Sequence, residues 1–126
     1  MKKILIVEDD FIIKIFFTQI INNCGGNVVG TLSNCNNILS TINELKPDIV
    51  FMDIAIEGNI NGIEATKLIN ANTNIPVVYI TGNSDKKTMD EAKKTNPLYI
   101  IKKPVDEQAL EDQIKIIYDK YNTIYV

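Results

Sequence analysis

Short apolar runs recur along the chain, and each is continuous rather than alternating with polar residues. Continuous runs of this length are typical of strands that are buried on both faces of a parallel sheet. A weaker run of the same kind follows the turn signal Gly25-Gly26. The pattern predicts five strands, at residues 4–7, 27–30, 49–52, 77–80 and 98–101.

Stretches of helical length separate these runs. The first, residues 11–21, is apolar nearly all round, which predicts a well-buried helix. Pro47, Pro76 and Pro97 each precede an apolar run, where a proline ends the preceding helix. Strands that alternate with helices predict a doubly wound α/β fold, with a five-stranded parallel sheet and helices on both faces. The other four expected helices have mixed faces and lie at residues 36–45, 62–70, 86–94 and 108–120.

Composition is ordinary for a globular protein and adds exclusions rather than a function. The 126 residues, 45% hydrophobic and 23% charged, suit one domain over residues 1–126. A net charge of −3 without a basic stripe argues against direct nucleic-acid binding. No segment approaches the length of a membrane span. The apolar run after Lys2 and Lys3 is too short for a signal peptide and ends in three acids.

The chain has two cysteines and no histidine. Cys24 and Cys35 have no metal-ligand spacing, and two unlinked thiols suit a reducing compartment, so we expect a cytoplasmic protein. The lack of histidine excludes zinc sites and acid–base catalysis that depend on imidazole.

Polar residues follow the expected strands at the points where they end. Glu8, Asp9 and Asp10 follow the first strand, and Asp53 follows the third. Ligands of open α/β sheets bind at the carboxyl ends of the strands, where the strand order reverses. If the strand order is 2-1-3-4-5, the first and third strands are neighbours, and Asp9 lies close to Asp53.

Carboxylates forced together repel each other unless a cation lies between them, and Mg²⁺ prefers such oxygen ligands. Thr81 after the fourth strand and Lys103 after the fifth add a hydroxyl and a fixed positive charge. These groups together provide the positioning and the charge neutralisation that phosphoryl transfer requires. Each residue taken singly has an ordinary interpretation: Asp10 is equally well a helix cap, and Thr81 and Lys103 alone are unremarkable. Asp53 is harder to explain as a plain surface acid, because it ends an apolar run.

In order and spacing, five segments of the chain resemble the response-regulator receiver domains of two-component signalling. The resemblance implies a flavodoxin-like fold with strand order 2-1-3-4-5. It covers nearly the whole chain and rests on residues 3–10, 47–54, 61–65, 78–81 and 103–104.

The resemblance also implies a role for each matched position. Asp53 is expected to accept a phosphoryl group from a sensor histidine kinase or a phosphotransfer protein. Thr81 and Lys103 would bind phosphoryl oxygens, Gly82 would leave the group accessible, and Pro104 would follow a cis peptide bond. The ligands expected for Mg²⁺ are the carboxylates of Asp9 and Asp53, Glu8 through a bound water, and the backbone carbonyl of Ala55.

Two positions depart from the family pattern. Ile100 stands where the family often has an aromatic switch residue, with Tyr99 beside it. The loop 57–62 lacks the frequent Pro-Gly and is expected to be neutral toward the acidic pocket. Of the two adjacent lysines, Lys103 rather than Lys102 is expected to enter the site, because the family pattern has a lysine directly before the proline. Alternation along a strand would also send Lys102 to the opposite face.

Two rival functions fit the residues less well. A Mg²⁺-dependent phosphohydrolase with an aspartate nucleophile would need a second acid where Ala55 stands. A flavin-binding module would need a loop rich in Ser, Thr and Gly after the first strand, where this chain has three acids. The resemblance implies that Ala55 and Asn83 flank the site, and these two side chains predict an intermediate lifetime for the acyl phosphate. The domain acts either alone on a downstream protein target or through an output domain absent from this sequence. The tail, which contains Tyr121 and Ile124, is equally well partner surface or packed on its own domain.

Overall fold

The computed structural model describes residues 1–82 and 85–125. Strands and helices alternate five times, as the apolar runs predict. Their order is β1 (Lys2–Val7), α1 (Phe11–Asn23), β2 (Gly26–Leu32), α2 (Ile38–Leu45), β3 (Ile49–Asp53), α3 (Gly62–Asn72), β4 (Val77–Thr81), α4 (Lys86–Lys93), β5 (Tyr99–Lys102) and α5 (Glu107–Tyr125). All five strands and all five helices are confirmed, with bounds that shift by up to five residues at the end of α5 and by less elsewhere.

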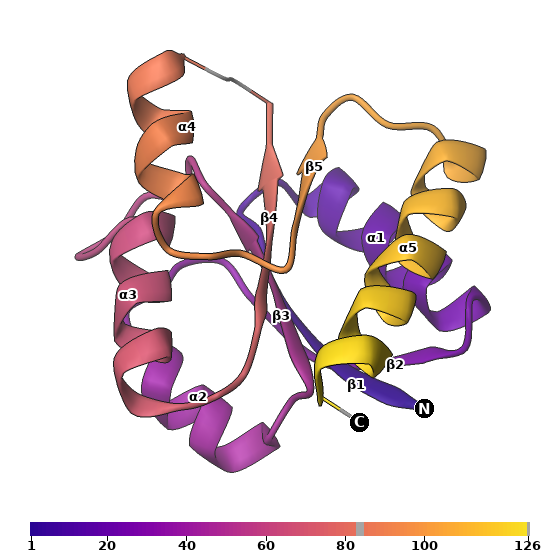
Figure 1. Cartoon of the computed structure of the whole chain (residues 1–126), viewed down its shortest axis with the longest axis horizontal. Coiled ribbons are helices and arrows are strands. Elements are labelled where there is room, and N and C mark those ends of the chain that lie inside the picture. Colours follow the sequence, from indigo (N-terminus) through magenta and orange to yellow (C-terminus); the bar gives the residue numbers. More distant parts are fainter. Residues whose placement is uncertain (83–84, 126) are drawn as a thin grey trace.

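The sheet is parallel, and its strand order is β2-β1-β3-β4-β5. Helices α1 and α5 cover one face, and α2, α3 and α4 cover the other (Figure 1). Alternate residues of a strand therefore enter different cores: Leu5 and Val7 pack with α2 and α3, whereas Ile4 and Ile6 pack with α1 and α5. This arrangement confirms the doubly wound, flavodoxin-like fold.

Helix α1 differs from its prediction. Its buried residues are Phe17, Ile20 and Ile21, but Phe11 is 67% exposed and Ile12 is 72% exposed. The prediction of a well-buried helix is therefore wrong for the N-terminal half of α1. A helix that packs on a sheet buries one face, and an apolar opposite face is buried only when a further layer covers it. None of the described elements forms such a layer over α1.

The C-terminal end of α5 is in part packed on its own domain, which is one of the two alternatives expected for the tail. The Tyr121 ring stacks on the Tyr125 ring at a centroid distance of 5.0 Å, and Nζ of Lys2 lies 4.7 Å from the Tyr121 centroid. Tyr121 is thus packed against β1 of its own domain, whereas Ile124 remains 62% exposed. Among the described residues, no helix is long and apolar enough to cross a membrane.

Candidate functional site

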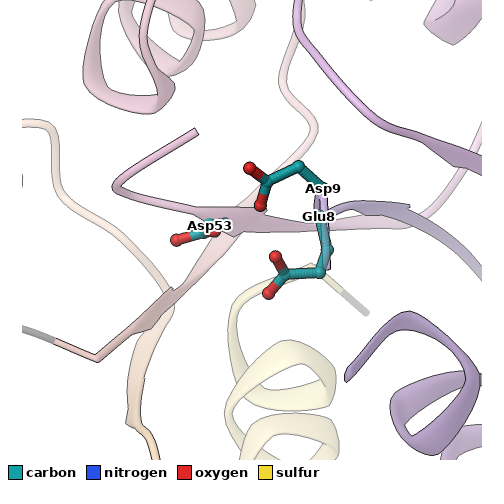
Figure 2. Close-up of side chains that lie close together, drawn as sticks. All are labelled: Glu8, Asp9 and Asp53. Carbon is teal, nitrogen blue, oxygen red and sulfur yellow. The ribbon is translucent and has the colours of Figure 1, made fainter. Parts of the chain in front are cut away.

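Three acids meet at the carboxyl edge of the sheet. Val7 pairs with Met52 in neighbouring strands, so the residues that follow, Glu8 and Asp53, lie side by side. Figure 2 shows the side chains of Glu8, Asp9 and Asp53 gathered in one place. One carboxylate oxygen from each of the three lies within 4.8 Å of the others. Glu8 and Asp53 are buried, while Asp9 is exposed at the rim.

Asp10 lies outside this cluster and caps a helix instead. Its Oδ1 accepts hydrogen bonds from the backbone N–H groups of Ile12 (2.9 Å) and Ile13 (3.1 Å). These N–H groups have no partner within the first turn of α1, so a capping acid stabilises the start of the helix. The cap interpretation of Asp10 is therefore confirmed.

The electrostatics of the cluster show an excess of negative charge. The pKa of Glu8 is raised to about 7: burial and the nearby Asp53 and Asp9 raise it, and the hydrogen bond from the backbone N–H of Asp10, at 3.1 Å, lowers it. Nζ of Lys103 lies 3.2 Å from Oε1 of Glu8 and 3.8 Å from Oδ2 of Asp53. Within the described part of the chain, Lys103 pairs with Glu8 and Asp53, and no cation is shown against Asp9. A divalent cation with oxygen ligands fits this set, because it would neutralise the charge that Lys103 leaves unbalanced.

Lys103 is the lysine that enters the site, as expected, while Lys102 at the end of β5 is exposed. The backbone of Lys103 donates to the carbonyl oxygen of Thr81 at 2.7 Å, which brings the ends of β4 and β5 together. Thr81 is 4% exposed. The peptide bond between Lys103 and Pro104 is cis, as the resemblance implies.

Local contacts fix the position of Asp53. Its Oδ1 accepts a hydrogen bond from the backbone N–H of Ala55 at 3.0 Å. Helix α3 starts directly behind it: Asn61 and Glu64 form a reciprocal capping box at the N-terminus of the helix. A Cβ at position 62 would collide with the carbonyl oxygen of Asp53, so only glycine allows α3 to begin this close.

The contact of Gly62 with Asp53 corrects the expectation that the loop 57–62 is neutral toward the site. The available signal in the sequence was Gly62 itself, because glycine is the residue that permits a close approach of the backbone. What the sequence did not show is which backbone approaches it. Asn83, expected to flank the site together with Ala55, lies outside the described residues.

An apolar groove adjoins the site and was not expected from the sequence. It has a volume of about 470 Å³, and Gly82 and Lys103 form part of its lining. The other lining residues are Ile12, Ile13, Phe16, Phe17, Pro104 and Val105. The signal in the sequence was the nearly all-apolar stretch 11–21, which we assigned to the core.

Comparison with known proteins agrees with this geometry. The sequence profile described as the response regulator receiver domain matches residues 4–115. The chain belongs to this family. Receiver domains are signalling modules that histidine kinases or phosphotransfer proteins phosphorylate, and they generally bind Mg²⁺. The resemblance stated from the sequence is thereby confirmed.

The curated relatives of this receiver domain include single-domain regulators. It is 32% identical over 104 residues to the chemotaxis protein CheY of Thermotoga maritima, covering 82% of this chain and 86% of that protein. It is 30% identical over 117 residues to sporulation initiation phosphotransferase F of Bacillus subtilis, covering 90% and 91%. In contrast, the receiver domain spans 45% of the length of an uncharacterized response regulatory protein of Vibrio vulnificus, to which it is 30% identical over 112 residues.

A solved structure shares the fold over almost the whole chain. The signal receiver domain of a modulated diguanylate cyclase from Desulfovibrio desulfuricans aligns with a TM-score of 0.86 and 28% identity. The alignment covers 98% of each chain. The strand order, and hence the meeting of β1 and β3 ends, is therefore that of a receiver domain.

Proposed function

We propose that Asp53 accepts a phosphoryl group from the phosphohistidine of a sensor histidine kinase or phosphotransfer protein. The observation that carries this proposal is the convergence of Glu8, Asp9 and Asp53 within 4.8 Å, with Lys103 beside them. A carboxylate oxygen of Asp53 attacks phosphorus, the P–N bond breaks, and the electron pair of that bond stays with the imidazole of the donor. The product is an aspartyl phosphate at the end of β3.

The side chains around Asp53 suit this reaction. Asp9 and Asp53 would hold Mg²⁺ through carboxylates, Glu8 through a water, and Ala55 through its backbone carbonyl. When bound, Mg²⁺ would neutralise charge on the transferring group. Lys103 already pairs with Glu8 and Asp53, and it would pair with a phosphoryl oxygen once Asp53 is modified. Thr81, at the end of the neighbouring strand, would donate its hydroxyl hydrogen to another phosphoryl oxygen.

The exposed apolar face of α1 supports a protein as the phosphoryl donor. Phe11, Ile12 and Ile15 are 67%, 72% and 48% exposed, which is unusual for three large apolar side chains on one helix. The adjoining groove includes Lys103 in its lining, so a surface that covers α1 also reaches the edge of the acidic site. A donor that buries this face would gain affinity without contacting Asp53 itself.

The domain would act as a switch rather than as an enzyme on a separate substrate. Phosphorylation would shift the population of two conformations only if the phosphoryl group interacts differently with each. We propose residues 1–126 as one receiver domain, located in the cytoplasm, that acts on a downstream protein target or on an attached output domain. With Ala55 beside the acceptor, we expect an acyl phosphate of intermediate lifetime.

The test is labelling of the purified protein with acetyl phosphate and Mg²⁺, followed by phosphate-affinity electrophoresis. We expect a shifted band for the wild type and for Asp119→Ala, a matched variant with an exposed aspartate on α5. We expect no shifted band for Asp53→Ala, and none for the wild type when EDTA replaces Mg²⁺. A shifted band that persists in Asp53→Ala would refute the assignment. Turnover of p-nitrophenyl phosphate would instead support the phosphohydrolase alternative.

A further inference from the structure

Buried hydroxyl groups connect β4, α3 and the C-terminal end of α4. Tyr79 of β4 is fully buried, and its Oη lies 2.7 Å from Oγ1 of Thr95, which follows α4. Oγ1 of Thr95 donates to the carbonyl oxygen of Ala92 at 2.6 Å. Nδ2 of Asn70, in α3, donates to the carbonyl oxygen of Thr95 at 2.8 Å. The C-terminal end of α4 is therefore bound both to the sheet and to α3.

The number of available hydrogens sets the direction of the central bond. A threonine hydroxyl carries one hydrogen, and that of Thr95 is already donated to Ala92. Tyr79 is therefore the donor and Oγ1 of Thr95 the acceptor. Both side chains are shielded from water, with Tyr79 at 0% and Thr95 at 6% exposure. Loss of the Thr95 hydroxyl would leave the buried Tyr79 donor without its acceptor, and loss of the Tyr79 hydroxyl would leave Oγ1 of Thr95 without its donor, so this bond is costly to break.

The same network reaches the phosphoacceptor site by two short routes. Tyr79 lies two residues before Thr81, so both side chains face the same side of the sheet. Thr66 of α3 lies beside the Tyr79 hydroxyl, and its own Oγ1 donates its hydrogen to the carbonyl oxygen of Gly62 at 2.8 Å. Gly62 in turn packs against the backbone of Asp53.

The N-terminal half of α4 is held much less firmly. Its cap is local: Asp85 accepts hydrogen bonds from the backbone N–H of Thr88 at 2.9 Å and from the hydroxyl of Thr88 at 2.8 Å. Lys86 and Lys87 are exposed, and the buried residue of this helix, Ala92, lies near its other end. A helix with one buried end and one solvated end opens or tilts more readily at the solvated end.

A pocket beside Thr81 leaves space next to this weakly held half. It has a volume of about 270 Å³. Asp85, Thr88 and Glu91 line it from α4 and its cap, and Ala55 and Thr81 line it from the strand ends. An inward shift of the start of α4 would close this space without disturbing the anchored end.

We propose that Tyr79 and Thr95 form the fixed hinge of a switch in which the N-terminal half of α4 moves over the pocket beside Thr81. The proposal rests on phosphorylation of Asp53 as the signal. A switch of this kind needs no aromatic ring at position 100, because its hinge lies at Tyr79 and Thr95. Ile100 and Met89 pack against the core cluster that contains Ala92. Tyr79 is thus a positioning residue, and its role is to confine the movement to one end of α4.

Hydrogen–deuterium exchange followed by mass spectrometry tests the hinge in wild type, Tyr79→Phe and Thr95→Val. Tyr99→Phe is the matched control, because it removes a hydroxyl from the neighbouring strand. Without ligand, we expect amides of residues 92–96 to exchange roughly tenfold faster in Tyr79→Phe and Thr95→Val than in the wild type. We expect no such change in Tyr99→Phe, and Thr95→Ser, which keeps the hydroxyl, should exchange like the wild type.

A second set of measurements uses Mg²⁺ and beryllofluoride to imitate the phosphoryl group. In the wild type, the change in exchange should be confined to residues 86–90, whereas in Tyr79→Phe it should extend through residues 92–96. Equal changes along all of α4 in the wild type would overturn the hinge, as would unchanged exchange of residues 92–96 in Tyr79→Phe. Acetyl phosphate labelling separates the two proposals. If wild-type Asp53 is not labelled, the switch fails together with the proposed function. If Asp53 is labelled but either of the two contradicting exchange results is found, the hinge alone is rejected.

Discussion

Glu8 is the acid on which the pH dependence of stability should depend most clearly. It is 1% exposed, and burial beside Asp53 and Asp9 raises its pKa from an ordinary 4.5 to about 7. The folded protein therefore binds this proton more tightly than the unfolded chain does. Below about pH 4.5, Glu8 is protonated in both states and does not change the free energy of unfolding. As the pH rises from about 4.5 to about 7, Glu8 lowers the free energy of unfolding progressively, and above about pH 7 the full destabilisation is present.

The magnitude of this effect follows from the two pKa values. The difference between about 7 and 4.5, at about 1.4 kcal/mol for each pH unit, corresponds to roughly 3 kcal/mol. Glu8→Gln removes the charge and keeps the shape of the side chain. We therefore expect this variant to gain up to about 3 kcal/mol over the wild type at about pH 8, and little or nothing near pH 4.5.

The assay is urea unfolding, followed by circular dichroism in EDTA at several values between pH 4.5 and pH 8. Glu44→Gln, an exposed glutamate on α2, is the control and should follow the wild type throughout. Mg²⁺ should narrow the gap at high pH, because a bound cation stabilises the ionised acids of the wild type. A difference between Glu8→Gln and wild type that does not change with pH would refute the reasoning.

Other substitutions test separate features of the structure. Gly62→Ala should destabilise the fold by about 1–3 kcal/mol in urea unfolding and reduce acetyl phosphate labelling, because its Cβ collides with the Asp53 carbonyl. A Cβ at Gly82 would lie at an ordinary contact distance of 3.6 Å from Cε of Lys103, so the free energy of unfolding of Gly82→Ala should be close to that of the wild type. An equal loss of stability in Gly62→Ala and Gly82→Ala would count against the collision at position 62. Tyr118 has a buried hydroxyl without a hydrogen-bond partner in the part of the chain that the structure describes. Tyr118→Phe should therefore raise the free energy of unfolding, measured in urea, by about 1 kcal/mol. A loss of stability would show that the hydroxyl has a hydrogen-bond partner. The double substitution Ile12→Ser and Ile15→Ser should leave labelling by acetyl phosphate unchanged and slow transfer from a phosphorylated protein donor at least tenfold, and equal transfer rates would exclude α1 from docking.

Much of the fold could be predicted because each strand carries its own burial pattern. Runs such as residues 49–52 are apolar at every position, and only a strand covered on both faces requires that. Acids after β1 and β3, together with Thr81 and Lys103, then marked one edge of the sheet. The choice of Lys103 over Lys102 also followed from the two-residue period of a strand, and the structure confirms it.

The errors have a common physical cause. An apolar pattern records which residues would gain from burial, but it does not say whether another layer is present to bury them. This is why the face of α1 that carries Phe11, Ile12 and Ile15 was assigned to the core.

Contacts between distant segments could likewise be identified only in the tertiary structure, because the sequence does not show which segments the fold brings together. Gly62 signalled a close approach, but only the packing of α3 behind β3 shows that Asp53 is the partner. Tyr79 and Thr95 are 16 positions apart and each is unremarkable in the sequence. The sequence alone determined the strands, the order of the motifs and which polar residues gather at the edge of the sheet. The tertiary structure decided which face stays exposed and which end of α4 is anchored, because both depend on what the fold places opposite each side chain.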